Sequence, residues 1–271
     1  MTKVLVLGST GMLGSAVANH FLNLNGYETH VTHRRDLKLN KNSIFFNACE
    51  DSFNLLPKVD YIINCIGIIK PFIVQDAYKS IYLNSLFPRK LANYCSSNRT
   101  KLIHVSTDCV YSGKKGGYTE ADVHDCLDFY GKSKSLGEPE NCMVLRTSII
   151  GEEIHKNASL VAWAISQGGL TVDGYSNHFW NGLTTKQYAK CCESIINNSL
   201  YINGLRHVHS PAVVSKRDML RMISDAFNLN LNIVDYETMD PCDRSLASNF
   251  ELSNILDIPV IEHQIKEMTN E

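Results

Sequence analysis

The 271-residue sequence predicts an α/β protein with a doubly wound parallel sheet and a smaller α/β region towards its carboxyl end. Three observations predict this fold class. Short apolar runs suited to buried strands alternate with amphipathic helical patterns from Val4 to Arg146. A glycine-rich turn lies directly between the first strand and the first helix. Beyond Gly151 the alternation loosens and the strands shorten. Repeated strand–helix alternation is the pattern of a parallel sheet covered by helices.

The first strand, Val4–Leu7, leads directly into the glycine-rich turn and then into a helix that ends at Asn25-Gly26. Glycines let the backbone approach a ligand closely, and the helix amino terminus offers free N–H groups and positive potential to a pyrophosphate. This order of elements favours a Rossmann-type dinucleotide site over a ligand-free turn. The residues predicted to contact the cofactor here are Gly8, Thr10, Gly11, Met12, Leu13 and Gly14.

The second strand, Glu28–Thr32, predicts which dinucleotide binds. An NAD site would often place an acidic residue just after this strand to hold the ribose hydroxyls, but the chain has Arg34 and Arg35. A guanidinium can bind the oxygens of a 2′-phosphate bidentately. We therefore expect NADP, used as NADPH in preference to NADH. The alternative is a solvated basic turn without a role in cofactor choice.

The next strands are predicted at 44–46 and 61–67, and Cys65, Ile66 and Gly67 should pass beside the cofactor. A helical region follows from about residue 76 to 96. Asn84 lies on it, and Pro88 should force a kink or a fresh start because proline lacks the N–H that an α-helix requires.

The fifth strand, Lys101–Val105, delivers Ser106 and Thr107 to its carboxyl end, where open α/β sheets bind their ligands. Tyr130 and Lys134 are spaced i and i+4, so they share one face of a helix. We expect Thr107 to hold a carbonyl oxygen and Tyr130 to donate a proton to it. The charge of Lys134 should lower the pKa of the phenol.

After a sixth strand at 143–146, helices are predicted at about 157–166, 185–197 and 216–227, with strands at 170–172, 205–208 and 231–234. We assign residues 1–150 and a returning segment near 183–208 to the dinucleotide-binding domain. Residues 151–182 and 209–271 form the predicted smaller substrate-binding domain.

A polar-aromatic loop at 174–182 is the predicted substrate contact of the smaller domain. Aromatic faces and directed hydrogen bonds suit a polar ligand. The alternative is that Phe179 and Trp180 pack one domain against the other. The predicted substrate-binding residues are Ser106, Thr107, Asn177, His178, Trp180 and Asn181.

Composition excludes several classes of function. The net charge is −2 with no long run of one sign, so nucleic acid is not an expected partner. No apolar run approaches the ~20 residues that cross a bilayer. The nine cysteines show neither a C-x-x-C pair nor histidines at zinc spacing, which predicts reduced thiols in a cytoplasmic protein and no metal site.

Taken together, four motifs resemble the extended short-chain dehydrogenase/reductase superfamily, and within it the dTDP-4-dehydrorhamnose reductase group. They are Gly8-x-x-Gly11-x-x-Gly14, Asn64-Cys65-Ile66-Gly67, Ser106-Thr107-Asp108 and Tyr130-x-x-x-Lys134. The resemblance covers nearly the whole chain. It implies a catalytic set of Thr107, Tyr130 and Lys134, with Asn84 positioning the lysine. It also implies NADPH-dependent reduction of the 4-keto group of a nucleotide-linked 6-deoxy sugar for surface polysaccharides, and a homodimer formed through the apolar faces around Tyr78–Cys95 and Leu136.

Departures from that group leave alternatives open. Its Asp-Gln-x-Gly-x-Pro-Thr stretch is replaced here by residues 177–185, so the sugar or its nucleotide is not specified. Related dehydratases carry Thr-Asp-Glu, whereas this chain has Cys109 in place of the glutamate. GDP-fucose synthases resemble the chain in that cysteine and in a histidine beyond the sixth strand, near His155. A bifunctional 3,5-epimerase/4-reductase is therefore one alternative, against a buried Cys109 and an exposed His155 without a catalytic role.

Three further alternatives remain. An epimerase that retains NAD would use the same Tyr130 and Lys134, but the two arginines after the second strand lean against it. A non-catalytic, dinucleotide-sensing regulatory subunit could share the fold, although such proteins often lose the tyrosine or the lysine. Reduction of a flavonoid or steroid carbonyl would call for a more apolar loop than 177–181.

Overall fold

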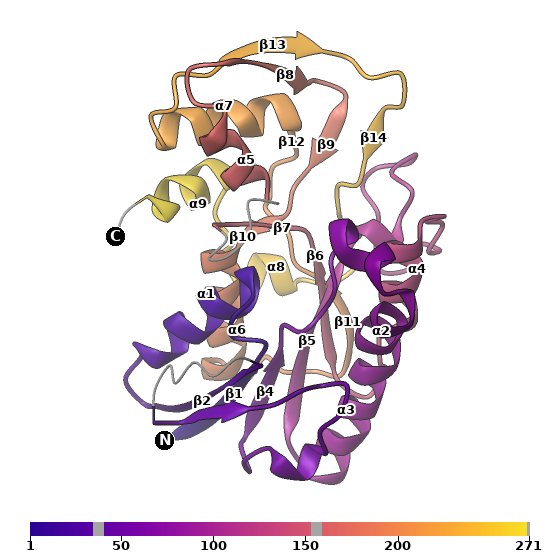
Figure 1. Ribbon diagram of the computed structural model, residues 1–271, viewed down its shortest axis with the longest axis vertical. Coiled ribbons are helices and arrows are strands. Elements are labelled where there is room, and N and C mark those ends of the chain that lie inside the picture. Colours follow the sequence, from indigo (N-terminus) through magenta and orange to yellow (C-terminus); the bar gives the residue numbers. More distant parts are fainter. Residues whose placement is uncertain (35–40, 153–158, 270–271) are drawn as a thin grey trace.

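The computed structural model describes residues 1–34, 41–152 and 159–269. Its centre is a parallel seven-stranded sheet with the order β11-β6-β5-β4-β1-β2-β3 (Figure 1). The predicted doubly wound sheet is confirmed. The strands are β1 (Thr2–Leu7), β2 (Tyr27–His33), β3 (Ser43–Phe45), β4 (Tyr61–Asn64), β5 (Lys101–Thr107), β6 (Met143–Thr147) and β11 (Gly204–His207).

Helices cover both faces of this sheet (Figure 1). On one face lie α1 (Met12–Leu22) and α6 (Thr185–Asn197), and on the other lie α3 (Phe87–Ser97) and α4 (Phe129–Leu136). Strand β1 illustrates how the sequence builds two cores. Val4 and Val6 pack into the cluster with α1 and α6, whereas Leu5 and Leu7 pack into the cluster with α3. The part of a strand that is buried on both faces must be apolar at every position, as Val4–Leu7 of β1 is.

The helical region predicted at 76–96 contains a change of helix type. It consists of α2 (Ala77–Ile81), a π-helical segment η3 (Tyr82–Leu86) and α3. Pro88 has no N–H for the carbonyl of Asn84, and its ring would crowd that carbonyl in a regular α-helix. The chain accommodates the proline with the wider π turn, so the expected kink is a π segment. Such segments are frequent at functional sites, and this one buries Asn84 completely.

The carboxyl-terminal region lies beyond the carboxyl ends of the central strands (Figure 1). Strand β8 (Thr171–Tyr175) pairs with β13 (Asn232–Tyr236), and β9 (His178–Trp180) lies between β12 (Val214–Ser215) and β14 (Cys242–Asp243). A two-stranded sheet pairs β7 (Ile149–Ile150) with β10 (Leu183–Thr184). The helices here are α5 (Leu160–Ser166), α7 (Lys216–Ala226), α8 (Leu252–Ile255) and α9 (Ile261–Met268).

Short 3₁₀ turns complete the description: η1 (Phe53–Leu55), η2 (Lys70–Gln75) and η4 (Asp108–Val110). No helix within the described part of the chain is long and apolar enough to cross a membrane.

Candidate active site

The glycine-rich turn after β1 has a backbone that only glycine accommodates at two positions. Gly8 has φ +81°, in the left-handed region, and a Cβ on Gly14 would lie 2.1 Å from the carbonyl oxygen of Gly8. Thr32 at the end of β2 fixes the turn, since its Oγ1 accepts a hydrogen bond from Gly8 N at 3.0 Å. Helix α1 begins next with Gly11 as its N-cap, and no side chain caps it. Its first N–H groups are thus available to a phosphate, which fits a dinucleotide.

The residues predicted to select NADP follow β2. Arg34 is exposed, and Arg35 lies outside the described residues. Arg34 directly follows β2, which is the neighbour of β1 in the sheet, and its charge reaches Cys49.

The segment after β4 connects the cofactor site to the predicted catalytic residues. The buried Asn64 side chain contacts His104 Nδ1 at 3.0 Å and accepts a hydrogen bond from Ile66 N at 3.1 Å. A Cβ on Gly67 would lie 3.4 Å from Asn84 Oδ1 and 4.0 Å from Lys134 Nζ. Gly67 therefore lies beside both residues.

Asn84 joins this segment to helix α4. Its Oδ1 accepts from Ile68 N at 2.8 Å, and its Nδ2 donates to Ile68 O at 2.9 Å and to Ser133 Oγ at 3.1 Å. A Cβ on Gly137 would lie only 1.8 Å from the carbonyl oxygen of Asn84, so α4 approaches the π segment closely. Asn84 thus holds the helix that carries the predicted tyrosine and lysine.

Helix α4 is also held at its amino end. The Asp128 side chain caps it by accepting from Gly131 N at 3.0 Å. A Cβ on Gly131 would lie 2.1 Å from the carbonyl oxygen of Cys109, so the helix abuts η4 immediately after Thr107. The Thr107 side chain is close enough to Tyr130 to offset part of the effect of burial on the pKa of the phenol. Lys134 is buried one turn further on, and its Nζ donates to Val105 O at 2.9 Å.

The electrostatics differ from one expectation. Burial raises the pKa of Tyr130 above its usual value, and the nearby Cys109 adds to this effect. Burial lowers the pKa of Lys134 to about 8. The pKa of the phenol is raised and not lowered, because the penalty for burying a phenolate is the largest effect on it. Tyr130 therefore keeps its proton at neutral pH. The expected effect of the Lys134 charge on this pKa stays a prediction.

Cys109 is not poised as a base. Burial, with a contribution from the neighbouring Asp108, raises the pKa of its thiol to about 12. Its backbone N–H donates to Thr107 Oγ1 at 3.2 Å, and Thr107 Oγ1 donates to Asp108 Oδ1 at 3.2 Å. His155, the other half of the predicted epimerase pair, lies outside the described residues.

Arg244 reaches this site although no sequence pattern pointed to it. It is half-buried, and it donates to the carbonyls of Tyr111 at 3.0 Å and Ser112 at 3.4 Å. Its charge acts on Cys109, Asp108 and Asp128. A single arginine in an irregular segment far along the chain carries no periodicity or motif, so sequence reasoning missed it.

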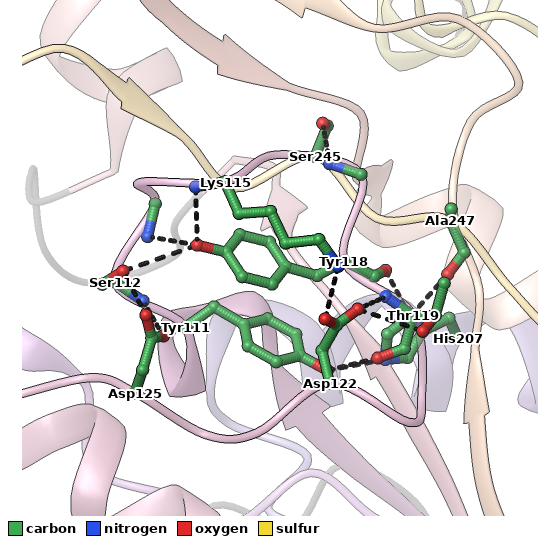
Figure 2. Close-up of polar contacts among 12 residues, drawn as sticks. Tyr111, Ser112, Lys115, Tyr118, Thr119, Asp122, Asp125, His207, Ser245 and Ala247 are labelled. Atoms are coloured by element: carbon green, nitrogen blue, oxygen red, sulfur yellow. Dashed lines mark hydrogen bonds and ion pairs between the residues drawn. The ribbon is translucent and has the colours of Figure 1, made fainter.

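A loop built around Tyr118 contacts the segment that carries Arg244, and Figure 2 shows Tyr118 together with Ser245 and Ala247 of that segment. The Tyr118 hydroxyl accepts from Gly113 N at 3.1 Å and Lys115 N at 3.0 Å, and its ring stacks on Tyr111 at 4.2 Å between centroids. The Tyr118 backbone pairs with the segment on either side of Leu246, through Ser245 O at 2.9 Å and Ala247 N at 2.8 Å. The segment carrying Arg244 is thereby fixed to the loop that follows the Thr107 motif.

Five of the predicted substrate-binding residues form contacts within the protein. Ser106 Oγ donates to Glu138 Oε1. Asn177 Nδ2 donates to Thr238 O at 2.8 Å, and His178 Nε2 contacts Thr238 Oγ1 at 2.9 Å. Asn181 exchanges two 2.8 Å hydrogen bonds with the Leu246 backbone. Trp180 lies in the core with α7, whereas Phe179 is 41% exposed. Binding a substrate through these polar groups would require exchanging hydrogen bonds, and their role stays a prediction.

Comparison with known proteins gives three kinds of relative. A family model described as the RmlD substrate binding domain matches residues 1–265. A methionine adenosyltransferase 2 subunit beta from Danio rerio is 30% identical over 252 residues, which cover 84% of this chain and 74% of that protein. A dTDP-4-dehydrorhamnose reductase from Aggregatibacter actinomycetemcomitans is 26% identical over 237 residues, covering 83% and 79%. The structure of a Bacillus anthracis dTDP-4-dehydrorhamnose reductase in complex with NADP superimposes with a TM-score of 0.81 at 20% identity, covering 98% of each chain.

Proposed function

We propose that this chain, which belongs to the RmlD substrate binding domain family, is an NADPH-dependent reductase. Its proposed substrate is the 4-keto group of a nucleotide-linked 6-deoxy sugar, in the synthesis of surface-polysaccharide sugars. The single observation that carries this proposal is that Tyr130 lies close to Thr107, while Lys134, one turn further along α4, lies beside Gly67. A protonated tyrosine next to a cofactor segment is suited to reducing a carbonyl.

Each side chain has a distinct role in the proposed mechanism. Bound NADPH supplies the hydride. Thr107 turns its one hydroxyl proton from Asp108 to the keto oxygen and holds that oxygen against Tyr130. As negative charge develops on that oxygen, Tyr130 transfers its phenolic proton to it. The ammonium of Lys134 stabilises the phenolate that this transfer leaves behind, and Asn84 keeps the helix that carries both residues in place.

The proposed cofactor site uses the glycine turn for the pyrophosphate and Cys65, Ile66 and Gly67 along the nicotinamide half. Support comes from the uncapped amino terminus of α1 and from the close packing of Gly14 on the carbonyl of Gly8, which brings that terminus to the end of β1. Arg34 and Arg35 would bind the 2′-phosphate. The relative solved with NADP belongs to the same reductase group that the sequence resembles.

The proposed substrate site includes Arg244 in addition to the residues expected from the sequence. A nucleotide sugar carries a diphosphate, and a half-buried guanidinium that faces Asp108 and Cys109 can attract that charge without leaving its place. The proposed assembly is a homodimer through the face of α2, α3 and α4, where Tyr78 is 84% and Leu136 62% exposed. The proposed location is the cytoplasm.

The direct experiment is NADPH oxidation against dTDP-, UDP-, GDP- and CDP-linked 4-keto-6-deoxy sugars. We expect oxidation with at least one of them, and an alcohol at carbon four identified by NMR. Binding of NADPH without oxidation by any substrate in the panel would contradict the proposal.

A second candidate is a regulatory subunit, because the Danio rerio relative is named as a subunit of a methionine adenosyltransferase. Its test is whether the purified chain binds a methionine adenosyltransferase catalytic subunit and changes its activity. Association together with silence across the sugar panel would favour this candidate. The presence of both Tyr130 and Lys134 favours the reductase.

The epimerising alternatives have separate readouts. The high pKa of Cys109 leaves little thiolate to abstract a proton at neutral pH. This argues against a bifunctional 3,5-epimerase/4-reductase. Turnover in deuterated water decides it, because an epimerase would incorporate deuterium at the ring carbons next to carbon four. An epimerase that retains NAD would change the sugar without net consumption of cofactor.

A further inference from the structure

Behind the catalytic residues, a buried ion pair joins the end of helix α4 to the central sheet. Glu138 is one turn after Lys134, and Arg146 on β6 is fully buried. Arg146 Nε donates to Glu138 Oε1 at 3.0 Å, and its Nη2 donates to Oε2 at 2.6 Å, so the pair is bidentate. A charge pair of this kind costs free energy to bury and does not by itself explain stability. It therefore calls for another role.

The same pair reaches the strand that holds Lys134. Ser106 Oγ donates to Glu138 Oε1, and Ser106 is the register partner of Arg146 across β5 and β6. The residue before it, Val105, accepts the hydrogen bond of Lys134 Nζ. Glu138 therefore ties together the helix that carries Lys134 and the strand that receives its ammonium.

We propose that Glu138, held by Arg146, is a positioning residue that keeps Lys134 charged and in place against Val105. This inference rests on the proposed function, in which a charged Lys134 supports proton transfer from Tyr130. It adds which group keeps the ammonium charged, namely the carboxylate of Glu138, just beyond the end of α4.

The groups around Lys134 leave Glu138 as the counter-charge. Burial raises the pKa of Cys65, after β4, to about 12, and holds the pKa of His104, on β5, well below its usual value, so both are neutral near pH 7. Tyr130, on α4, keeps its proton. Burial and Arg146 likewise lower the pKa values of the two histidines that contact Arg146, His207 to about 4 and His124 to a lesser extent. Among the described neighbours of Lys134, Glu138 carries the negative charge that favours the ammonium.

The test measures the protonation of Lys134 directly, without substrate. The chain is labelled with ¹³C at lysine Cε, and the Lys134 signal is assigned by its loss in Lys134→Met. Its chemical shift is then followed against pH. In the native chain we expect a midpoint near 8. In Glu138→Gln the midpoint should fall by about one pH unit, the scale of a nearby opposite charge. The matched control Glu140→Gln, at an exposed position two residues later, should leave the midpoint unchanged.

A second pair of variants separates charge from folding. Arg146→Gln removes the cation and leaves the carboxylate, so it should not lower the midpoint. Glu138→Gln alone leaves the buried Arg146 without its partner and can fail to fold. The double variant Glu138→Gln/Arg146→Gln leaves no uncompensated charge, and it should still lower the midpoint of the Lys134 titration. An unchanged midpoint without Glu138, or an equal fall in Arg146→Gln, would overturn the inference. Because no turnover is involved, silence across the sugar panel would contradict the proposed function and leave this titration standing.

Discussion

Helix α4 and the segment around β9 were both predicted to bring polar side chains to the substrate, but the two regions position these side chains differently. On α4, glycines at 131 and 137 allow the close backbone contact that places Tyr130 and Lys134. Lys134 uses one of its three ammonium protons on Val105 O at 2.9 Å. Around β9, the polar side chains already have partners in the carboxyl-terminal segment. Asn177 and His178 contact Thr238, and Asn181 accepts a hydrogen bond from the Leu246 backbone. The difference teaches that a reactive side chain needs neighbours that position it without using up its reactive atom.

Tyr130→Phe is the largest test of this difference. Loss of the proton donor should lower kcat by about 10³-fold or more, because general acid catalysis contributes on that scale. NADPH binding should persist, since the ring still fills the same space. Stopped-flow oxidation and a fluorescence titration measure the two effects. A variant that keeps near-native turnover would remove Tyr130 from the mechanism.

Gly137→Ala tests whether the placement of α4 depends on its close approach to Asn84. The new Cβ would lie 1.8 Å from the Asn84 carbonyl, so the helix must shift. A shift of about 1 Å can cost about 10²-fold in rate, and we expect that loss in kcat/KM. The control is Gly168→Ala, where the nearest atom would lie 3.5 Å from the Cβ. Equal activity in the two variants would contradict the role of the close approach.

How much of the fold and of the candidate site the sequence predicts depends on how far apart along the chain the interacting residues lie. The parallel sheet, the glycine turn and the Tyr130–Lys134 pair follow from local periodicity and spacing. The π segment was foreseeable only in part, since Pro88 predicts a break but not its form. The Glu138–Arg146 pair and the hydrogen bonds of Asn181 join elements whose register only the folded chain defines. The position of Arg244 depends on the pairing of Tyr118 with the segment around Leu246, and no sequence pattern predicts that pairing.

Arg244→Gln tests a cation that the carboxyl-terminal segment brings close to Asp108 and Asp128, beside helix α4. Losing the charge should raise KM for the nucleotide sugar about tenfold and change kcat little, as expected for a contact equally strong in ground and transition states. Arg221→Gln, on exposed α7, is the matched control. If KM stays at the native value while kcat falls, Arg244 acts on the chemistry instead of on binding.

Asn177→Ala should have the smallest effect on activity. Its side chain holds Thr238 by donating to the carbonyl at 2.8 Å and accepting from the N–H at 3.1 Å. We expect a loss of about 1–2 kcal/mol in the free energy of unfolding, measured by urea denaturation, with KM unchanged. A raised KM with an unchanged free energy of unfolding would show that Asn177 binds the substrate. It would contradict the difference between β9 and α4.

The most direct measurement of the central claim is single-turnover transfer from NADPH deuterated at the transferable position of the nicotinamide. The account predicts deuterium at carbon four of the sugar product, formed by the native chain and lost in Tyr130→Phe. A native chain that binds the cofactor and a 4-keto sugar nucleotide but transfers no deuterium to carbon four would contradict it.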